Sequence, residues 1–245
     1  RYGALIIDGA SPTLRGMKFN DINTTSVLAT NLAQPTFIGG EYVAGNDGRS
    51  GVTGQAVQVY GGGTPISPMI FEGASFQSTD KGCGNRDGGR SAIWASQTFI
   101  RIDDSEVTSG DFGFSIRNSA GKITNSSLTV ACNGIDVNSL KAVGDTEYNV
   151  EIAYNTISTT EKTPITVYAG ANGDIHDNVL EGAGDGSGIA VYSAKAAINN
   201  NVIGPIGGWN GLWLLGSYDV IAENNTIFET AREPVLAGEY GSQAP

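Results

Sequence analysis

Residues 174–227 read DIHDNVLEGAGDGSGIAVYSAKAAINNNVIGPIGGWNGLWLLGSYDVIAENNTI, and this stretch repeats itself. Aligned on Asn178, Asn201 and Asn225, it gives three similar lines whose asparagines are 23 and 24 residues apart. Short strand-like runs lie between these lines, at residues 188–192 and 211–215. A fixed period of about 20–50 residues is typical of a fold built from stacked, similar coils.

A six-residue unit recurs through most of the chain. It begins and ends with an apolar residue, its third position is a turn residue, and the other positions hold any residue. Gly, Asn and Asp tolerate a left-handed backbone, so these residues predict a sharp bend at the turn position. One position breaks the rule, because it holds a tyrosine. The turn residues are Gly16, Gly39, Gly73, Asp104, Asn125, Tyr154, Asp177, Asn200 and Asn224.

A second column of apolar pairs precedes each turn, usually by 11 or 12 residues, and runs from Leu5/Ile7 to Val235/Ala237. A spacing of two places both members of a pair on the same face of a strand. Equivalent strands then stack in parallel and need crossovers, which are usually helices. This chain carries 35 glycines and no apolar pattern at helical spacing, so each coil must supply its own crossover. We therefore predict an all-β fold, a single parallel β-helix domain over residues 1–245 with about ten coils, right-handed as crossovers are.

The asparagine column at 155, 178, 201 and 225 and the inward aliphatic pairs resemble the right-handed parallel β-helix superfamily, the pectate-lyase-like fold. The resemblance covers nearly the whole chain and implies a fold, because many activities occur on it. The vWIDH-like and RxPxxR-like segments of pectate lyases are absent. So are the NTD, DD, GHG and RIK set of polygalacturonases and the DPHE of mannuronan epimerases. No catalytic set transfers from these families.

Composition limits the partners. The net charge of −11 argues against nucleic acid and anionic membranes, and no apolar run is long enough to span a bilayer. A secreted or cell-surface protein that uses Ca²⁺ is compatible with this acidity. The coils begin almost at the first residue, and an uncapped end exposes a sheet edge. This suggests a homo-oligomer, a larger surface assembly or a longer parent chain.

The cysteines, Cys83 and Cys132, fit no metal spacing. In an oxidising compartment they are candidates for a disulfide, and the alternative is a buried free thiol.

Solenoid function usually lies in the insertions and on one flanking face. Extra residues occur at 43–56, 61–69, 77–92, 139–149 and 158–164, on both borders of the first-column strands. These segments predict a walled groove over the outward face of that sheet. Strand alternation assigns its floor, which mixes aromatic and polar groups suited to the flat faces and hydroxyl edges of sugars. The predicted substrate-binding residues are Tyr60, Trp94, Asn138, Tyr168, Tyr192 and Trp213.

Two charged residues near the middle of this floor, Arg117 and Asp136, occupy adjacent coils, and we expect their Cα atoms to lie one rung apart, about 4.8 Å. A simple ion pair is one reading. A β-eliminating lyase is a second, with Arg117, Lys141 or Lys81 as cation and Asp136, Asp111 or Asp145 holding calcium. Glycoside hydrolysis by Asp136 with a second carboxylate, such as Asp111, is a third.

These patterns predict a carbohydrate-active protein that binds, and in two of these readings cleaves, a polysaccharide. The alternative is a non-catalytic adhesion, filament or tail-fibre module whose aromatic strip is a contact surface.

Overall fold

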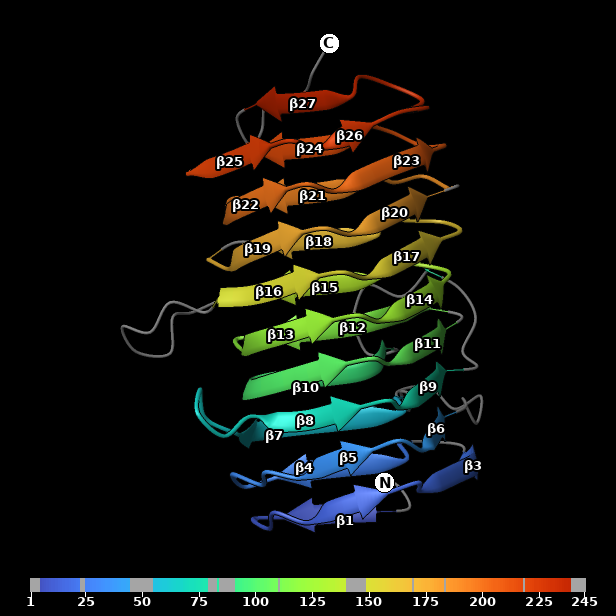
Figure 1. The fold of residues 1–245 in the computed structure, drawn as a ribbon, viewed down its shortest axis with the longest axis vertical. Helices are drawn as coiled ribbons and strands as arrows, with labels where there is room; N and C mark the ends of the chain where they lie inside the picture. The colour runs from blue at the N-terminus through green and yellow to red at the C-terminus, as the bar shows by residue number, and fades with distance from the viewer. Residues whose placement is uncertain are drawn as a thin grey trace.

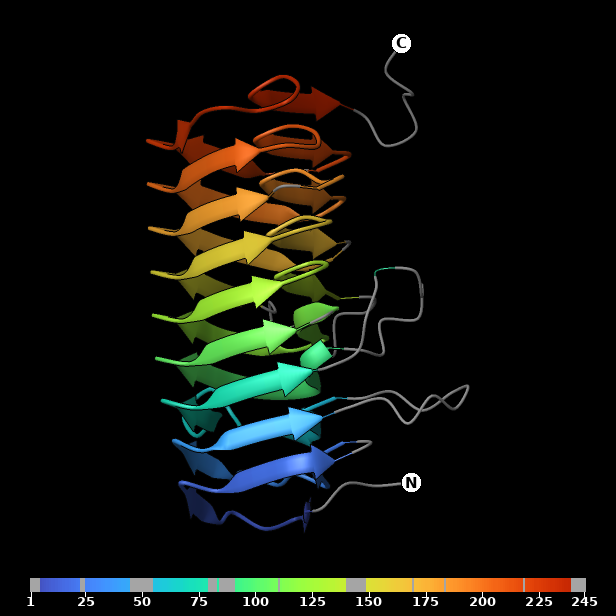
Figure 2. The same ribbon diagram turned by 90° about the vertical axis from the view of Figure 1, so that its right-hand side faces the viewer.

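The structure is a computed structural model, and it describes residues 5–22, 25–44, 55–78, 83, 91–109, 111–139, 149–168, 170–182, 184–217 and 219–238. These residues form 27 strands, and no helix occurs among them. Every pairing between these strands is parallel, with each strand beside its equivalent in the next coil (Figure 1). The chain thus winds as a solenoid with three faces of stacked parallel strands, called sheets A, B and C, and one long strand runs from sheet A into sheet B (Figure 2).

Sheet A carries the first-column pairs. Its strands are β1 (Leu5–Asp8), β4 (Val27–Thr30), β7 (Val57–Gly62), the first part of β10 (Ser91–Asp103), β12 (Phe112–Arg117), β15 (Ile135–Asn138), β18 (Ile165–Tyr168), β21 (Ile189–Tyr192), β24 (Leu212–Leu215) and β27 (Val235–Gly238).

Sheet B comes next in each coil. Its strands are β2 (Thr13–Arg15), β5 (Thr36–Ile38), β8 (Met69–Glu72), the second part of β10, β13 (Ala120–Thr124), β16 (Asn149–Ala153), β19 (Asn172–His176), β22 (Lys195–Asn199) and β25 (Val220–Glu223).

Sheet C completes the coil. Its strands are β3 (Lys18–Ile22), β6 (Glu41–Ala44), β9 (Ser75–Ser78), β11 (Glu106–Ser109), β14 (Ser127–Val130), β17 (Thr156–Thr159), β20 (Val179–Gly182), β23 (Val202–Ile206) and β26 (Thr226–Ile227).

The inward columns form one continuous core. In sheet A, Ile135 pairs with Ile165 and Ile165 with Ile189, and all three are fully buried. Towards the N-terminal end the core is aromatic, and the rings of Phe37 and Phe71 stack at 4.7 Å. Because neighbouring coils present the same side-chain type at the same height, each coil buries the apolar face of the next.

The predicted turn column is confirmed at every position. All nine residues have a left-handed backbone, with φ between 48° and 62°, and each lies at the bend between sheets B and C. Tyr154 has the same backbone geometry as the other turn residues, with φ of 59°, although tyrosine is not a usual turn residue. It is 58% exposed. A bulky residue in this region carries a steric cost that Asn and Gly avoid.

Replacing Tyr154 with asparagine is therefore expected to raise the free energy of unfolding by about 1 kcal/mol. The variant gives up an edge contact between the Tyr154 and His176 rings, 5.6 Å apart, but little buried area, since the tyrosine is exposed. Denaturant unfolding measures the change. The reverse substitution Asn200→Tyr, at the same bend two coils on, is the matched control and should lose a similar amount. A less stable Tyr154→Asn protein would contradict the assignment of strain.

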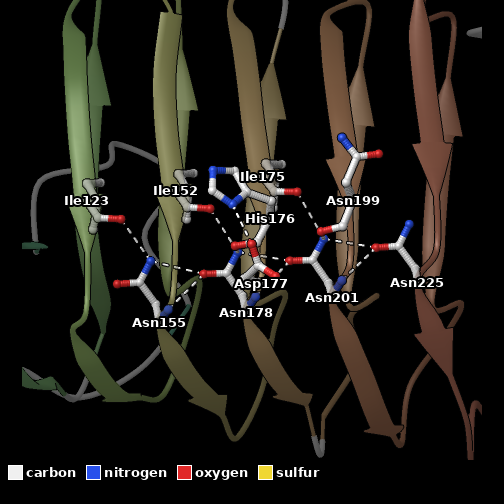
Figure 3. Close-up of polar contacts among 10 residues, drawn as sticks. All are labelled: Ile123, Ile152, Asn155, Ile175, His176, Asp177, Asn178, Asn199, Asn201 and Asn225. Atoms are coloured by element: carbon white, nitrogen blue, oxygen red, sulfur yellow. Dashed lines mark hydrogen bonds and ion pairs between the residues drawn. The ribbon is translucent and has the colours of Figure 1, made fainter.

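The asparagine column lies one residue after the bend and forms a hydrogen-bonded ladder (Figure 3). Side-chain amide nitrogens donate to the next carboxamide oxygen, at 3.0 Å from Asn155 to Asn178, 2.9 Å from Asn178 to Asn201 and 2.9 Å from Asn201 to Asn225. The same oxygens accept the backbone N–H of the preceding asparagine. Towards the N-terminus the ladder continues with serine, because Ser105 N–H donates to Ser126 Oγ and Ser126 N–H donates to Asn155 Oδ1.

Candidate binding site on sheet A

The outward side chains of sheet A form two parallel rows. Pairing places Trp94 beside Ser115, Ser115 beside Asp136, and Asp136 beside Thr166. The full first row is Gln58, Trp94, Ser115, Asp136, Thr166, Ala190 and Trp213. The second row contains Tyr60, Ser96, Arg117 and Asn138, and further along Tyr168, Tyr192 and Leu215. All six predicted substrate-binding residues thus lie on one face of one sheet.

The aromatic rings on this face fall into two groups. Tyr60 and Trp94 are in contact at 4.4 Å. Tyr168 stacks on Tyr192 at 5.2 Å with 13° between the planes, and Tyr192 meets Trp213 edge-on at 5.4 Å. A polar section of two rungs, β12 and β15, separates the groups, so Trp94 and Tyr168 are about 14 Å apart along the solenoid. An extended ligand could lie across both groups.

A hollow of about 310 Å³ lies beside the second aromatic group. Thr166 forms part of its floor, and the rings of Tyr168, Tyr192 and Trp213 border it. The remaining lining residues are Cys83, Phe112, Asn133, Lys162, Thr163, Asp185, Gly186 and Trp209.

A side-chain ladder that sequence reasoning missed forms one wall of this hollow. Lys162 Nζ lies 3.6 Å from a carboxylate oxygen of Asp185, and that carboxylate accepts a hydrogen bond from the Trp209 indole. Arg232 lies over the Trp209 ring at 4.7 Å, and Trp209 contacts Trp213 at 4.5 Å. The four positions of this ladder, of which Lys162, Asp185 and Trp209 line the hollow, are 23, 24 and 23 residues apart, which is the period of the asparagine column. That spacing was a signal for them, although their residue types differ.

Four buried polar atoms of the outward rows have no hydrogen-bond partner among the described residues: Asp136 Oδ1, Asn138 Oδ1, Thr166 Oγ1 and Trp213 Nε1. Two of them, Thr166 Oγ1 and Trp213 Nε1, belong to residues that line the hollow. Thr166 is 1% exposed and lines the hollow. An unpaired buried polar atom costs about 1–3 kcal/mol, so such groups call for a specific explanation. A ligand with hydroxyl groups, or ordered water in its place, would satisfy both.

The polar section is centred on Asp136, which is 6% exposed. Burial raises the pKa of the Asp136 carboxyl to about 6, and the nearby Arg117 charge and a hydrogen bond from Asn133 offset part of this rise. Its Oδ1 atom has no partner among the described residues. A carboxyl with a pKa of about 6 can exchange a proton near neutral pH.

The register corrects one expectation about this section. Asp136 pairs with Ser115, whereas Arg117 pairs with Asn138, so the two charges are offset by two residues along the strands and their Cα atoms are not one rung apart. Arg117 Nε donates a hydrogen bond to Ser115 Oγ at 3.3 Å. Arg117 therefore acts on Asp136 through the field of its charge.

Asp111 is the one of the other predicted catalytic residues that the structure describes, and it does not lie on this face. Asp111 lies in the turn before β12, 1% exposed, with Oδ1 2.9 Å from Cys132 Sγ. Its carboxyl thus lies against a sulfur atom and outside the outward rows of sheet A. Lys81, Lys141 and Asp145 fall outside the described residues.

Cys83 and Cys132 form a disulfide, with Cα atoms 5.5 Å apart. Together with Asp111 they are the one group of three potential metal ligands that the described part of the chain brings together. The two sulfurs are already bonded to each other and calcium prefers oxygen ligands, so this group does not fit calcium. Calcium binding elsewhere stays a prediction.

The predicted groove walls are described only in part. Most of 43–56, 77–92 and 139–149 falls outside the described residues. From 158–164, Lys162 and Thr163 line the hollow on sheet A. From 61–69, Thr64, Pro65 and Pro68 line a different hollow, on sheet B.

No described helix is long and apolar enough to cross a membrane.

Three parallel sheets, a left-handed bend in every coil and an internal amide ladder define a parallel β-helix. The chain belongs to the right-handed β-helix family, since the model of the right handed beta helix region matches residues 43–227. No curated protein and no solved structure gives a significant match to it. Membership of this family establishes the fold and its handedness.

Proposed function

We propose that the outward face of sheet A binds a polysaccharide chain, and that the hollow bordered by Tyr168, Tyr192 and Trp213 holds part of it. The observation that carries this proposal is the meeting, in one 310 Å³ hollow, of the Tyr168, Tyr192 and Trp213 rings with Thr166 Oγ1, a buried atom that has no hydrogen-bond partner among the described residues. Sugar rings have apolar faces that stack on aromatic rings and hydroxyl edges that pair with buried donors and acceptors. The first aromatic group, Tyr60 and Trp94, extends the same surface beyond Asp136.

A secreted or cell-surface location goes with this function. The Cys83–Cys132 disulfide supports it, because disulfides persist in oxidising compartments. The net charge of −11 favours neutral polysaccharides over polyanions, unless calcium bridges the charges. An adhesion or filament module would use the same surface for binding without cleavage.

Replacing Trp213 with alanine is expected to weaken polysaccharide binding at least tenfold, because it removes a ring that contacts both Tyr192 and Trp209. Glycan-array screening followed by titration calorimetry, with and without calcium, measures this. Phe228→Ala is the matched control, since it removes a 41%-exposed ring just after β26, away from sheet A, and should change affinity less than twofold. Equal affinity of the Trp213→Ala and wild-type proteins would refute the assignment.

Cleavage of the bound chain is a second candidate function, favoured by the buried Asp136 carboxyl between the two aromatic groups. From β7 to β24, Asp136 is the one carboxylate in the outward rows of sheet A that the structure describes. Hydrolysis by a carboxylate pair needs a second one, so elimination fits these residues better. In that reaction Asp136 takes the proton next to a uronate carboxylate, a carbon–carbon double bond forms, and the bond to the leaving sugar oxygen breaks. The nearby Arg117 supplies positive charge.

Activity assays separate these possibilities. Unsaturated product, read by its ultraviolet absorbance and lost in Asp136→Asn, supports elimination. New reducing ends without that absorbance support hydrolysis. Binding without either product supports the adhesion module.

A further inference from the structure

A second hollow, of about 860 Å³, lies on the outward face of sheet B. Sheet B follows sheet A around a corner of the coil, so this hollow faces a different side of the solenoid from the proposed polysaccharide site. It is lined by Thr64, Pro65 and Pro68 from the corner loop after β7, by Phe99, Ile100, Arg101 and Asp103 of β10, by Ala120, Gly121, Lys122 and Thr124 of β13, and by Asn125, Asn149, Glu151 and Tyr154.

Aromatic rings mark the two ends of this hollow. Phe99 pairs in register with Ala120, whose small side chain leaves one side of the ring uncovered by that neighbour. Tyr154 lies at the opposite end, at the bend towards sheet C, and is 58% exposed. Two rungs and about five residues along the strand separate the two rings, which is roughly 20 Å. The hollow is therefore shaped for an extended ligand.

The position of Tyr154 indicates that its ring serves ligand binding and not the stability of the fold. Every other residue of the turn column is Gly, Asn or Asp, whereas Tyr154 holds a left-handed backbone with φ of 59°. The ring gains little from burial, and its described aromatic neighbour is the edge of His176. Residues kept in costly backbone conformations cluster at ligand sites, and Tyr154 lines the sheet B hollow.

The charges around the hollow are balanced and paired. Lys122 Nζ lies 2.5 Å from Glu151, and the Arg101 guanidinium donates to Asp103 at 3.1 Å. Asp103 also accepts hydrogen bonds from Thr124 and Asn125. Two cations and two anions leave no net charge on the described lining residues. Such a rim offers donors and acceptors but does not favour an ion, so it matches a neutral ligand with hydroxyl groups.

From these observations we infer that sheet B carries a second, independent binding site for an extended neutral glycan, with Phe99 and Tyr154 as its stacking platforms. This site does not depend on the proposed site on sheet A. A protein with both sites would either let one polysaccharide wrap around the solenoid or cross-link two polysaccharides.

The test uses the Trp213→Ala protein, in which binding on sheet A is expected to be at least tenfold weaker, and neutral cello-, xylo- and manno-hexaose as probes. We expect this protein to retain binding of at least one hexaose, with an affinity that changes less than twofold between low and high salt. Adding Tyr154→Asn should weaken the remaining binding at least fivefold. Since this substitution relieves backbone strain, the unfolding midpoint should not fall, and loss of binding then reflects loss of the ring. Phe99→Ala should weaken binding in the same way.

Each other outcome overturns the inference. If Trp213→Ala abolishes all hexaose binding that the wild type shows, sheet A alone binds glycan, and the sheet B site is refuted while the proposed function stands. If hexaose binding persists but Tyr154→Asn and Phe99→Ala leave it unchanged, the ligand lies elsewhere. If the residual binding is confined to oligouronates and falls with salt, the neutral-ligand assignment is wrong.

Discussion

Replacing Asn178 with alanine is expected to lower the free energy of unfolding by about 3 kcal/mol, because several buried hydrogen bonds are lost together. Asn178 is 1% exposed. Its amide nitrogen has two N–H groups and lies within hydrogen-bond distance of three acceptors, the carbonyl of Ile152 at 2.8 Å, that of His176 at 2.9 Å and Asn201 Oδ1 at 2.9 Å, so one N–H is shared between two of them. Its carboxamide oxygen accepts the backbone N–H of Asn155 at 3.0 Å. Alanine leaves that N–H unpaired inside the solenoid, where water cannot replace the lost partner. Denaturant unfolding monitored by circular dichroism measures the loss.

The chain itself supplies graded controls for this prediction. Ser126 occupies the same column and uses its hydroxyl to accept from Ser105 N–H and to donate to the carbonyl of Thr124. Asn178→Ser should therefore lose about half as much free energy of unfolding as Asn178→Ala. Asn225→Ala should cost less than Asn178→Ala, because Asn225 ends the described ladder and is only half-buried. Equal stability of the alanine and serine variants at 178 would mean that packing, and not the amide ladder, holds this bend.

The fold could be predicted because its signals are periodic and local. A left-handed bend favours Gly, Asn or Asp for steric reasons, and an inward aliphatic pair recurs at the same place in each coil, so nine bends and the sheet A columns follow from the sequence. Tyr154 shows why position outweighs residue type. The neighbouring coils hold the bend at Tyr154, because Asn125 N–H donates to the carbonyl of Ala153 and Tyr154 N–H donates to the carbonyl of His176.

The sites could be predicted less well, because they depend on relations between coils that residue type does not reveal. Alternation placed Asp136 and Arg117 on the correct face, but only the register shows that Ser115 and not Arg117 lies beside Asp136. The wall of the sheet A hollow escaped notice because its successive residues, such as Lys162, Asp185 and Trp209, share a period but no chemistry. The sheet B hollow depends on where a corner loop turns, which no local pattern indicates.

Asp136→Asn is expected to stabilise the protein above pH 6, by as much as about 3 kcal/mol. The folded-state pKa of Asp136 is about 6 against an ordinary value of 3.8, and each unit of difference corresponds to about 1.4 kcal/mol. The folded protein thus binds this proton more tightly than the unfolded chain does. Between about pH 4 and pH 6 the unfolded state has released the proton and the folded state has not, so stability falls as the pH rises through this window and stays lower above it.

Unfolding measured from pH 3.5 to pH 8 in both proteins isolates this effect, because every other titrating group cancels in the difference. The two proteins should have similar stability near pH 3.5 and diverge as the pH rises towards 6. Asp103→Asn gives a control of opposite sign, since hydrogen bonds from Thr124, Asn125 and Arg101 hold the pKa of the Asp103 carboxyl below its ordinary value despite partial burial. Removing that carboxylate should lose stability above pH 4.

The outcome at Asp136 also bears on function. A stabilised Asp136→Asn protein that no longer cleaves polysaccharide would show a buried acid kept for chemistry at a cost in stability, a trade-off known at active sites. A stabilised variant that still binds and cleaves polysaccharide would leave Asp136 outside the chemistry. Binding without cleavage in the wild type as well as the variant would favour the adhesion module. A variant less stable than the wild type at pH 7 would mean that the Arg117 charge and the Asn133 hydrogen bond outweigh the burial of the carboxyl. The pKa of Asp136 would then lie below its ordinary value, and elimination would need a different base.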